Sequence, residues 1–142
     1  MAKVDDVAAA VLARTGPIDT WRFQKLMYYC QAWHLVWEDA ALFPNRIEAW
    51  ANGPVVPELY PNHRGKYELR DWQWGRPENL TANEISTIDA VLGTYAPQPG
   101  QWLSALTHSE PPWIEARVGL ADGERGNREI PKEAMLEYYG SL

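Results

Sequence analysis

The chain has 142 residues, 46% of them hydrophobic, and its 19 acidic and 13 basic side chains give a formal net charge of -6 at pH 7. A chain of this length forms one hydrophobic core, so we expect a single domain over residues 1–142. The acidic balance and the absence of a Lys/Arg block argue against direct binding to nucleic acid. No apolar run approaches the ~18 residues of a membrane span, and no secretory leader opens the chain. With a single cysteine, which fits a reducing compartment, we expect a cytoplasmic protein without membrane contact.

Apolar residues at three- and four-residue steps predict two helices in the first part of the chain. The first covers residues 4–12 and ends at Gly16-Pro17. The second begins with Asp19 or Thr20 as its N-cap and carries one broad apolar stripe. The stripe comprises Phe23, Leu26, Met27, Cys30, Trp33, His34 and Trp37. We expect this second helix to lie at the centre of the core.

The segment after the second helix is rich in turn residues. Residues 47–50 predict a short strand or turn that leads into Asn52-Gly53-Pro54. Pro54 and Pro57 restrict the backbone and favour a helix start near Pro57-Glu58. Residues 61–79 show no regular period, and we expect a long surface connection there.

Thr81 and Glu84 form a capping-box pattern that predicts a helix through Tyr95. After it we expect a short helix that ends near residues 107–109 and a helical turn that bears Trp113. A flexible loop at 122–129 and a terminal helix from Pro131 complete the chain. The predicted fold is therefore a mainly α, compact single-domain structure with at most a small β element near residues 47–51.

Candidate chemical groups are sparse. The three histidines, His34, His63 and His108, lie far apart without a second ligand at helical spacing, so no metal site is expected. We expect His34 to be partly buried with its ring bonded to nearby backbone, and His63 to be a solvated loop residue. Cys30 lies four residues before His34, which leaves a catalytic pair as an alternative, although a cysteine in an aromatic stripe acts more often as a small hydrophobic residue.

No other catalytic or phosphate-binding motif is present. Ser104, Ser109 and His108 lack the elbow of a serine hydrolase. The chain also has no glycine-rich loop for a phosphate group, so we expect no cofactor.

Aromatic residues are the most informative feature, because eight tryptophans and seven tyrosines accompany only two phenylalanines. Such rings on a stiff loop are typical anchors of protein–protein interfaces. The predicted partner-binding patch comprises Trp50, Asn52, Gly53, Pro54, Val55 and Tyr60, with His108, Ser109 and Trp113 as a second edge.

Two segments resemble the Panacea antitoxin family, a phage-associated group with SocA-like members. The first runs from Phe23 to Tyr60 and contains QKLMYY, WHL and IEAWANGPVVP, and the second is LSALTHSEPPWIEAR from Leu103 to Arg117. The resemblance implies an antitoxin of a type II-like toxin–antitoxin system that neutralises a cognate toxin by direct protein contact. It implies no enzymatic activity, and it does not identify the toxin.

Several alternatives stay open at this point. In a second hypothesis the chain is a proteolytic adaptor, because SocA-like members deliver their toxin to a protease. A protease would then be a further partner. A third is a phage-associated accessory protein without a toxin. A fourth is an enzyme that uses Cys30 and His34, or His108. The sequence also leaves homo-oligomer formation open.

Overall fold

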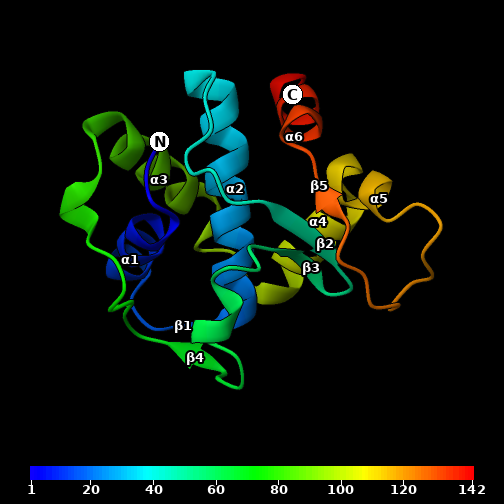
Figure 1. The fold of residues 1–142 in the computed structure, drawn as a ribbon, viewed down its shortest axis with the longest axis horizontal. Coiled ribbons are helices and arrows are strands. Elements are labelled where there is room, and N and C mark those ends of the chain that lie inside the picture. Colours follow the sequence, from blue (N-terminus) through cyan, green and yellow to red (C-terminus); the bar gives the residue numbers. More distant parts are fainter.

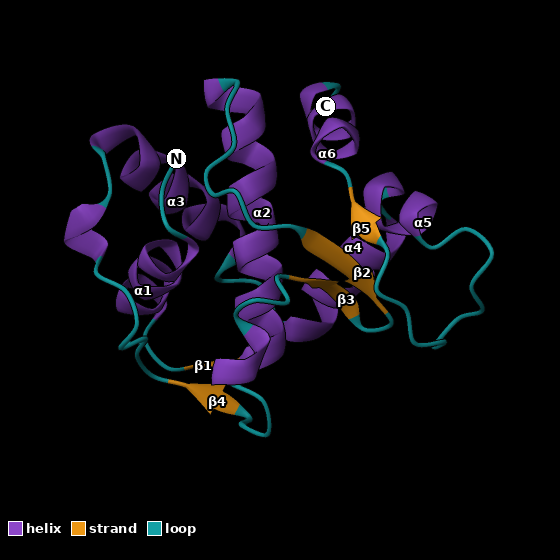
Figure 2. Cartoon of the chain, in the orientation of Figure 1, coloured by secondary structure: helices purple, strands orange, loops and turns teal.

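Helix α2 (Thr20–Glu38) runs through the middle of the molecule, and the other helices surround it (Figure 1). The computed structural model describes residues 1–142. Helices make up 54% of the chain and strands 9%, so the mainly helical class is confirmed (Figure 2). The helices that pack directly on α2 are α1 (Val4–Thr15), α3 (Ala82–Tyr95), α4 (Gly100–Ser109) and α6 (Lys132–Gly140), while α5 (Pro111–Ala116) contacts α4 and α6.

The predicted helix starts are confirmed at two positions. The Asp19 carboxylate accepts a hydrogen bond from the Arg22 amide at 3.0 Å and so caps α2. Thr81 and Glu84 form both hydrogen bonds of the capping box at the start of α3. The apolar stripe of α2 is wrong at its end, where the side chain of Trp37 is 48% exposed. Helix α2 ends one residue later at Glu38, so Trp37 lies on its last turn, which the core no longer covers.

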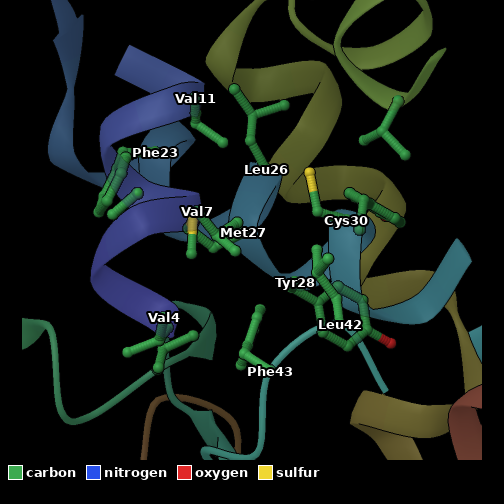
Figure 3. Packing of buried hydrophobic residues seen from close by; sticks show 14 of the residues in the cluster. Val4, Val7, Val11, Phe23, Leu26, Met27, Tyr28, Cys30, Leu42 and Phe43 are labelled. Atoms are coloured by element: carbon green, nitrogen blue, oxygen red, sulfur yellow. The ribbon is translucent and has the colours of Figure 1, made fainter. Parts of the chain in front are cut away.

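Most of α2 is buried because it contacts the other elements on several sides. Figure 3 shows Val7 of α1 beside Met27 of α2, with Cys30 further along the same helix. These side chains belong to one cluster of 33 buried hydrophobic residues. Burial of this apolar surface is the main stabilising contribution to the fold.

The β structure is larger than the predicted element at residues 47–51. Strand β2 (Ile47–Trp50) pairs antiparallel with β3 (Gly53–Val55) on one side and with β5 (Glu129–Ile130) on the other. A second sheet joins β1 (Ile18–Asp19) to β4 (Glu68–Leu69). Two-residue strands are too short to show an alternating pattern, which is why the sequence does not reveal β1, β4 and β5.

Residues 61–79 form the expected long connection and are mostly exposed, but His63, Leu69 and Trp72 within it are buried. The helix start expected at Pro57-Glu58 is wrong. The chain instead forms two 3-10 turns, Tyr60–Asn62 and Pro77–Asn79, on either side of β4. Trp72 is only 4% exposed, stacks on Phe23 at 5.4 Å between ring centroids, and donates a hydrogen bond from Nε1 to Asp5 at 2.9 Å. The segment therefore closes the core over α1 and the first turns of α2.

A buried tyrosine and carboxylate network ties α5 to α2 and α6. Glu110 is 6% exposed, and its Oε1 accepts hydrogen bonds from the hydroxyls of Tyr29 at 2.6 Å and Tyr139 at 2.8 Å. Burial raises the pKa of Glu110, and the two hydroxyl bonds offset part of this effect. Because the folded state holds the proton more tightly than the unfolded state, this group loses stabilising power as the pH rises above 4.5.

We expect the stability of Glu110→Gln relative to the wild type to increase as the pH rises. The amide keeps an oxygen acceptor for the two tyrosines and carries no charge to bury. The difference in the free energy of unfolding between variant and wild type, measured by urea denaturation from pH 4.5 to pH 7, should shift in favour of the variant as the pH rises from 4.5. A difference that does not change across this range would contradict the assignment.

Candidate partner-binding site

Gln24 of α2 fixes the backbone after β3. Its side-chain oxygen accepts a hydrogen bond from the Val56 amide at 2.8 Å, and its amide nitrogen lies 2.8 Å from Nε2 of His63. Because the Val56 N–H requires the oxygen, the Gln24 nitrogen must donate to the histidine. His63 therefore accepts through Nε2, and its ring is neutral. One glutamine thus holds both the end of the Gly53-Pro54-Val55 strand and the turn after Tyr60.

The expectation that His63 is solvated is wrong. Its side chain is 4% exposed, and burial lowers its pKa, which agrees with the neutral ring. The local sequence suggests an exposed loop because it is polar, but the partner that buries the ring lies 39 residues earlier in the chain.

Lys25 lies beneath the turn between β2 and β3. It is 4% exposed, and burial lowers its pKa. The negative charge of Asp19 raises the pKa and offsets part of this effect. A Cβ added at Gly53 would lie 3.1 Å from Lys25 Cε and 3.4 Å from its Nζ. Gly53 also has a φ of +132°, which side chains other than glycine's rarely allow. Glycine is therefore required at this position by its backbone angle and by the close approach of the lysine.

We expect Gly53→Ala to lower the free energy of unfolding by about 1–3 kcal/mol, because the added methyl group meets Lys25 and the backbone angle becomes strained. Urea denaturation measures the loss. Gly93→Ala in α3 is the matched control, since nothing lies within 4 Å of a Cβ there. The control should be stabilised by about 0.5–1 kcal/mol. Equal stability of the two variants would show that Gly53 is not constrained.

The second predicted edge is joined to the first by hydrogen bonds to three consecutive carbonyl groups. Trp113 Nε1 donates to the carbonyl of Trp50 at 3.0 Å, and Arg117 donates to that of Ala49 at 3.0 Å. The ring of His108 lies against Trp113 at 4.2 Å between centroids, with Nε2 3.2 Å from the carbonyl of Ala51. The corner between α4 and α5 therefore sets the position of β2 and of the turn that follows it.

The predicted patch divides into buried and accessible members. Gly53, Pro54, Val55 and Trp113 are buried, so they shape the surface from below. Trp50, Tyr60 and His108 are partly exposed, and Asn52 and Ser109 are exposed. The rings of Trp50 and Tyr60 meet edge to face at 5.0 Å, and Trp50 Nε1 donates to Glu48 at 2.8 Å. These contacts hold two partly exposed aromatic rings in fixed orientations.

A cavity of about 520 Å³ opens beside these rings. Its walls are Trp21, Trp50, Ala51, Asn52, Tyr60, Arg125, Gly126 and Asn127. Three of the walls, Trp50, Asn52 and Tyr60, belong to the predicted patch, whereas His108 and Ser109 do not line the cavity. Sequence reasoning missed Trp21, which falls outside the apolar stripe of α2. It also missed residues 125–127, which belong to a loop between α5 and β5.

The other residues considered for chemistry have structural surroundings. Cys30 is fully buried, and burial raises the pKa of its thiol. His34 is 5% exposed and donates from Nδ1 to the carbonyl of Ala40 at 2.7 Å, so the predicted backbone bond is confirmed. No group of three or more His, Cys, Asp or Glu side chains is placed to hold a metal ion. None of the helices combines the length and the apolar character needed to span a bilayer.

A protein-family model matches residues 23–114, which is more than half of the chain. The family is described as antitoxin SocA-like, Panacea domain. No curated protein and no solved structure matches the chain. The matched range contains α2 from Phe23 onward, the strands β2 and β3, and His108 and Trp113 of the corner between α4 and α5. Trp21 and Arg117 lie outside it. The chain therefore belongs to the SocA-like Panacea antitoxin family.

Proposed function

We propose that the protein is an antitoxin that neutralises a cognate toxin in the cytoplasm by binding it directly and covering its active surface. The observation that carries this proposal is the position of the aromatic cavity within the fold. Trp50, Asn52 and Tyr60 lie inside the family-matched range, and hydrogen bonds from α2, α4 and α5 hold the turn that presents them.

The physical argument rests on rigidity. An interface loses affinity when flexible side chains and loops must be ordered on binding. Here Gln24, Trp113 and Arg117 fix the backbone on both sides of the turn, and each is buried. Aromatic side chains that are already held in place make good anchors for a protein partner, because they bury a large area at a small entropic cost.

The decisive experiment is co-expression with the product of the adjacent gene. Growth of the cells and the amount of a purified stoichiometric complex are measured together. Growth rescue with a stable complex supports neutralisation by binding. Rescue with disappearance of the toxin favours a proteolytic adaptor, and the absence of both rescue and complex contradicts the antitoxin proposal.

The proposed contact surface has its own test. Asn52→Ala and Tyr60→Ala should each weaken the complex, since both side chains line the cavity. Ser109→Ala serves as the comparison, because Ser109 is exposed but does not line it. If both cavity variants bind the toxin as tightly as the wild type, the contact surface lies elsewhere.

A further inference from the structure

A second, smaller cavity adjoins the first one. Its volume is about 100 Å³, and it shares Trp21 and Tyr60 with the larger cavity. The remaining walls of the smaller cavity are Thr20, Gln24, Val55, His63, Arg64, Gly65 and Lys66. The two aromatic rings therefore stand between two hollows, and we name the combined surface the aromatic groove.

The charges around the aromatic groove have one sign. Arg125 lines the larger cavity, and Arg64 and Lys66 line the smaller one, whereas neither cavity has an aspartate or glutamate in its wall. This distribution is the opposite of that in the whole chain, where 19 acidic residues outnumber 13 basic ones. A groove without acidic walls in an acidic protein favours an anionic occupant.

The three cations of the groove have no ion-pair partner in the protein. Salt bridges occur at five other arginines: Arg14, Arg22, Arg46, Arg70 and Arg76. Two carboxylates next to wall residues are already engaged: Glu48 pairs with Arg46 and accepts from Trp50, and Asp19 pairs with Arg22. Arg64, Lys66 and Arg125 are thus available to carboxylates of another molecule.

A buried ammonium group adds to the positive potential. Nζ of Lys25 lies 5.8 Å from the centroid of the Trp21 ring, and no carboxylate lies within salt-bridge distance of it. The Trp21 ring itself is 42% exposed. An occupant of the groove would therefore meet aromatic surface and unpaired positive charge together.

We propose that the aromatic groove receives an extended segment of the partner protein in which an aromatic or aliphatic anchor is flanked by carboxylates. The proposal rests on the proposed function, in which the partner is a protein. The anchor packs between the Trp21, Trp50 and Tyr60 rings, and the carboxylates pair with Arg125 on one side and with Arg64 and Lys66 on the other. The net charge of -6 repels a nucleic acid strand as a whole, so a local acidic segment fits the surface better than a phosphate polymer does.

The inference is tested with the full chain and two blocked peptides, Glu-Asp-Phe-Asp-Glu and Lys-Arg-Phe-Arg-Lys, followed by fluorescence anisotropy of an attached dye. The acidic peptide should bind roughly fivefold more tightly or better, and its affinity should fall with added salt. Equal binding of the two peptides, tighter binding of the basic one, or no binding of the acidic one up to about 1 mM overturns the proposal. ATP serves as a nucleotide probe, and binding of ATP in place of the acidic peptide would overturn it in favour of a nucleotide.

Two variants with the same change in net charge locate the effect. Arg125→Glu places a negative charge on the groove, whereas Lys3→Glu places one at the start of α1, on the opposite side of α2 (Figure 1). Neither side chain forms an ion pair, so both variants should fold normally. Arg125→Glu should weaken the acidic peptide roughly fivefold or more, and Lys3→Glu should change it less than about twofold. Equal effects of the two variants would overturn the assignment to the groove.

The same variants separate this inference from the proposed function. If the adjacent gene product binds Arg125→Glu and wild type equally well, the groove inference fails while the antitoxin proposal stands. If the acidic peptide binds the groove but the adjacent gene product forms no complex and gives no rescue, the antitoxin proposal fails instead.

Discussion

Replacing Gln24 by leucine is expected to lower the free energy of unfolding by about 2–4 kcal/mol. The leucine fills most of the space but leaves the Val56 amide without an acceptor and the His63 ring without its donor. Both groups are buried, so water does not replace the lost bonds. Urea denaturation at pH 7 measures the loss.

Gln24→Glu is the matched control for this prediction. Its carboxylate keeps an acceptor for the Val56 amide but cannot donate to a neutral His63. A charge buried at this position also costs free energy, so the loss at pH 7 should be at least as large as that of the leucine variant. It should shrink as the pH falls, when the site takes up a proton that bridges the introduced carboxyl group and His63, whereas the leucine variant should show no such recovery. If the leucine variant is as stable as the wild type, Gln24 does not hold the strand and the turn together.

Trp21→Ala is expected to weaken the complex with the partner by about 2 kcal/mol or more, which is roughly a 30-fold loss of affinity. The ring is 42% exposed and stands between the two cavities, where a partner would cover it. Isothermal titration calorimetry with the purified toxin gives the affinity. The variant should remain folded, because much of the ring already contacts solvent.

Trp37→Ala provides the control on the same helix. Trp37 is 48% exposed, similar to Trp21, but it lies 16 residues further along α2, about 24 Å away at 1.5 Å per residue. Its loss should change the affinity less than about twofold. A similar loss in both variants would mean that the partner does not distinguish the two ends of the helix, and the site would have to be placed elsewhere.

The helical framework could be predicted because its determinants are local. Asp19 caps α2 through an amide three residues away, and Thr81 and Glu84 cap α3 within one turn. The turn that leads into Gly53-Pro54 was also recognisable, since glycine allows backbone angles that other residues avoid and proline fixes its own φ wherever it occurs. What these residues do in the fold depends on their own chemistry and on nearest neighbours, so one sequence suffices to predict them.

The walls of the cavity could be predicted only in part, because distant segments form them. Trp50 and Tyr60 stand out as aromatic residues near a stiff turn. Trp21 does not, since its place on the helix is set by where α2 meets β3 and the turn at Tyr60. Arg125 lies in a polar loop that resembles any solvated loop until β5 pairs with β2 and brings it to the cavity. His63 was misjudged for the same reason.

The loop between α5 and β5 supplies one wall of the cavity while contributing little to the core. Arg117 at its start donates to the carbonyls of Ala121 and Glu124, Arg128 near its end donates to that of Val118, and most residues between them are exposed. The family match ends at residue 114, before this loop. The opposite wall, with Trp50 and Tyr60, lies within the matched range. Exchanging residues 118–127 should therefore replace one wall and leave the helical framework intact. If the cavity is the contact surface proposed above, this loop is a natural place for evolution, or for engineering, to change the choice of partner.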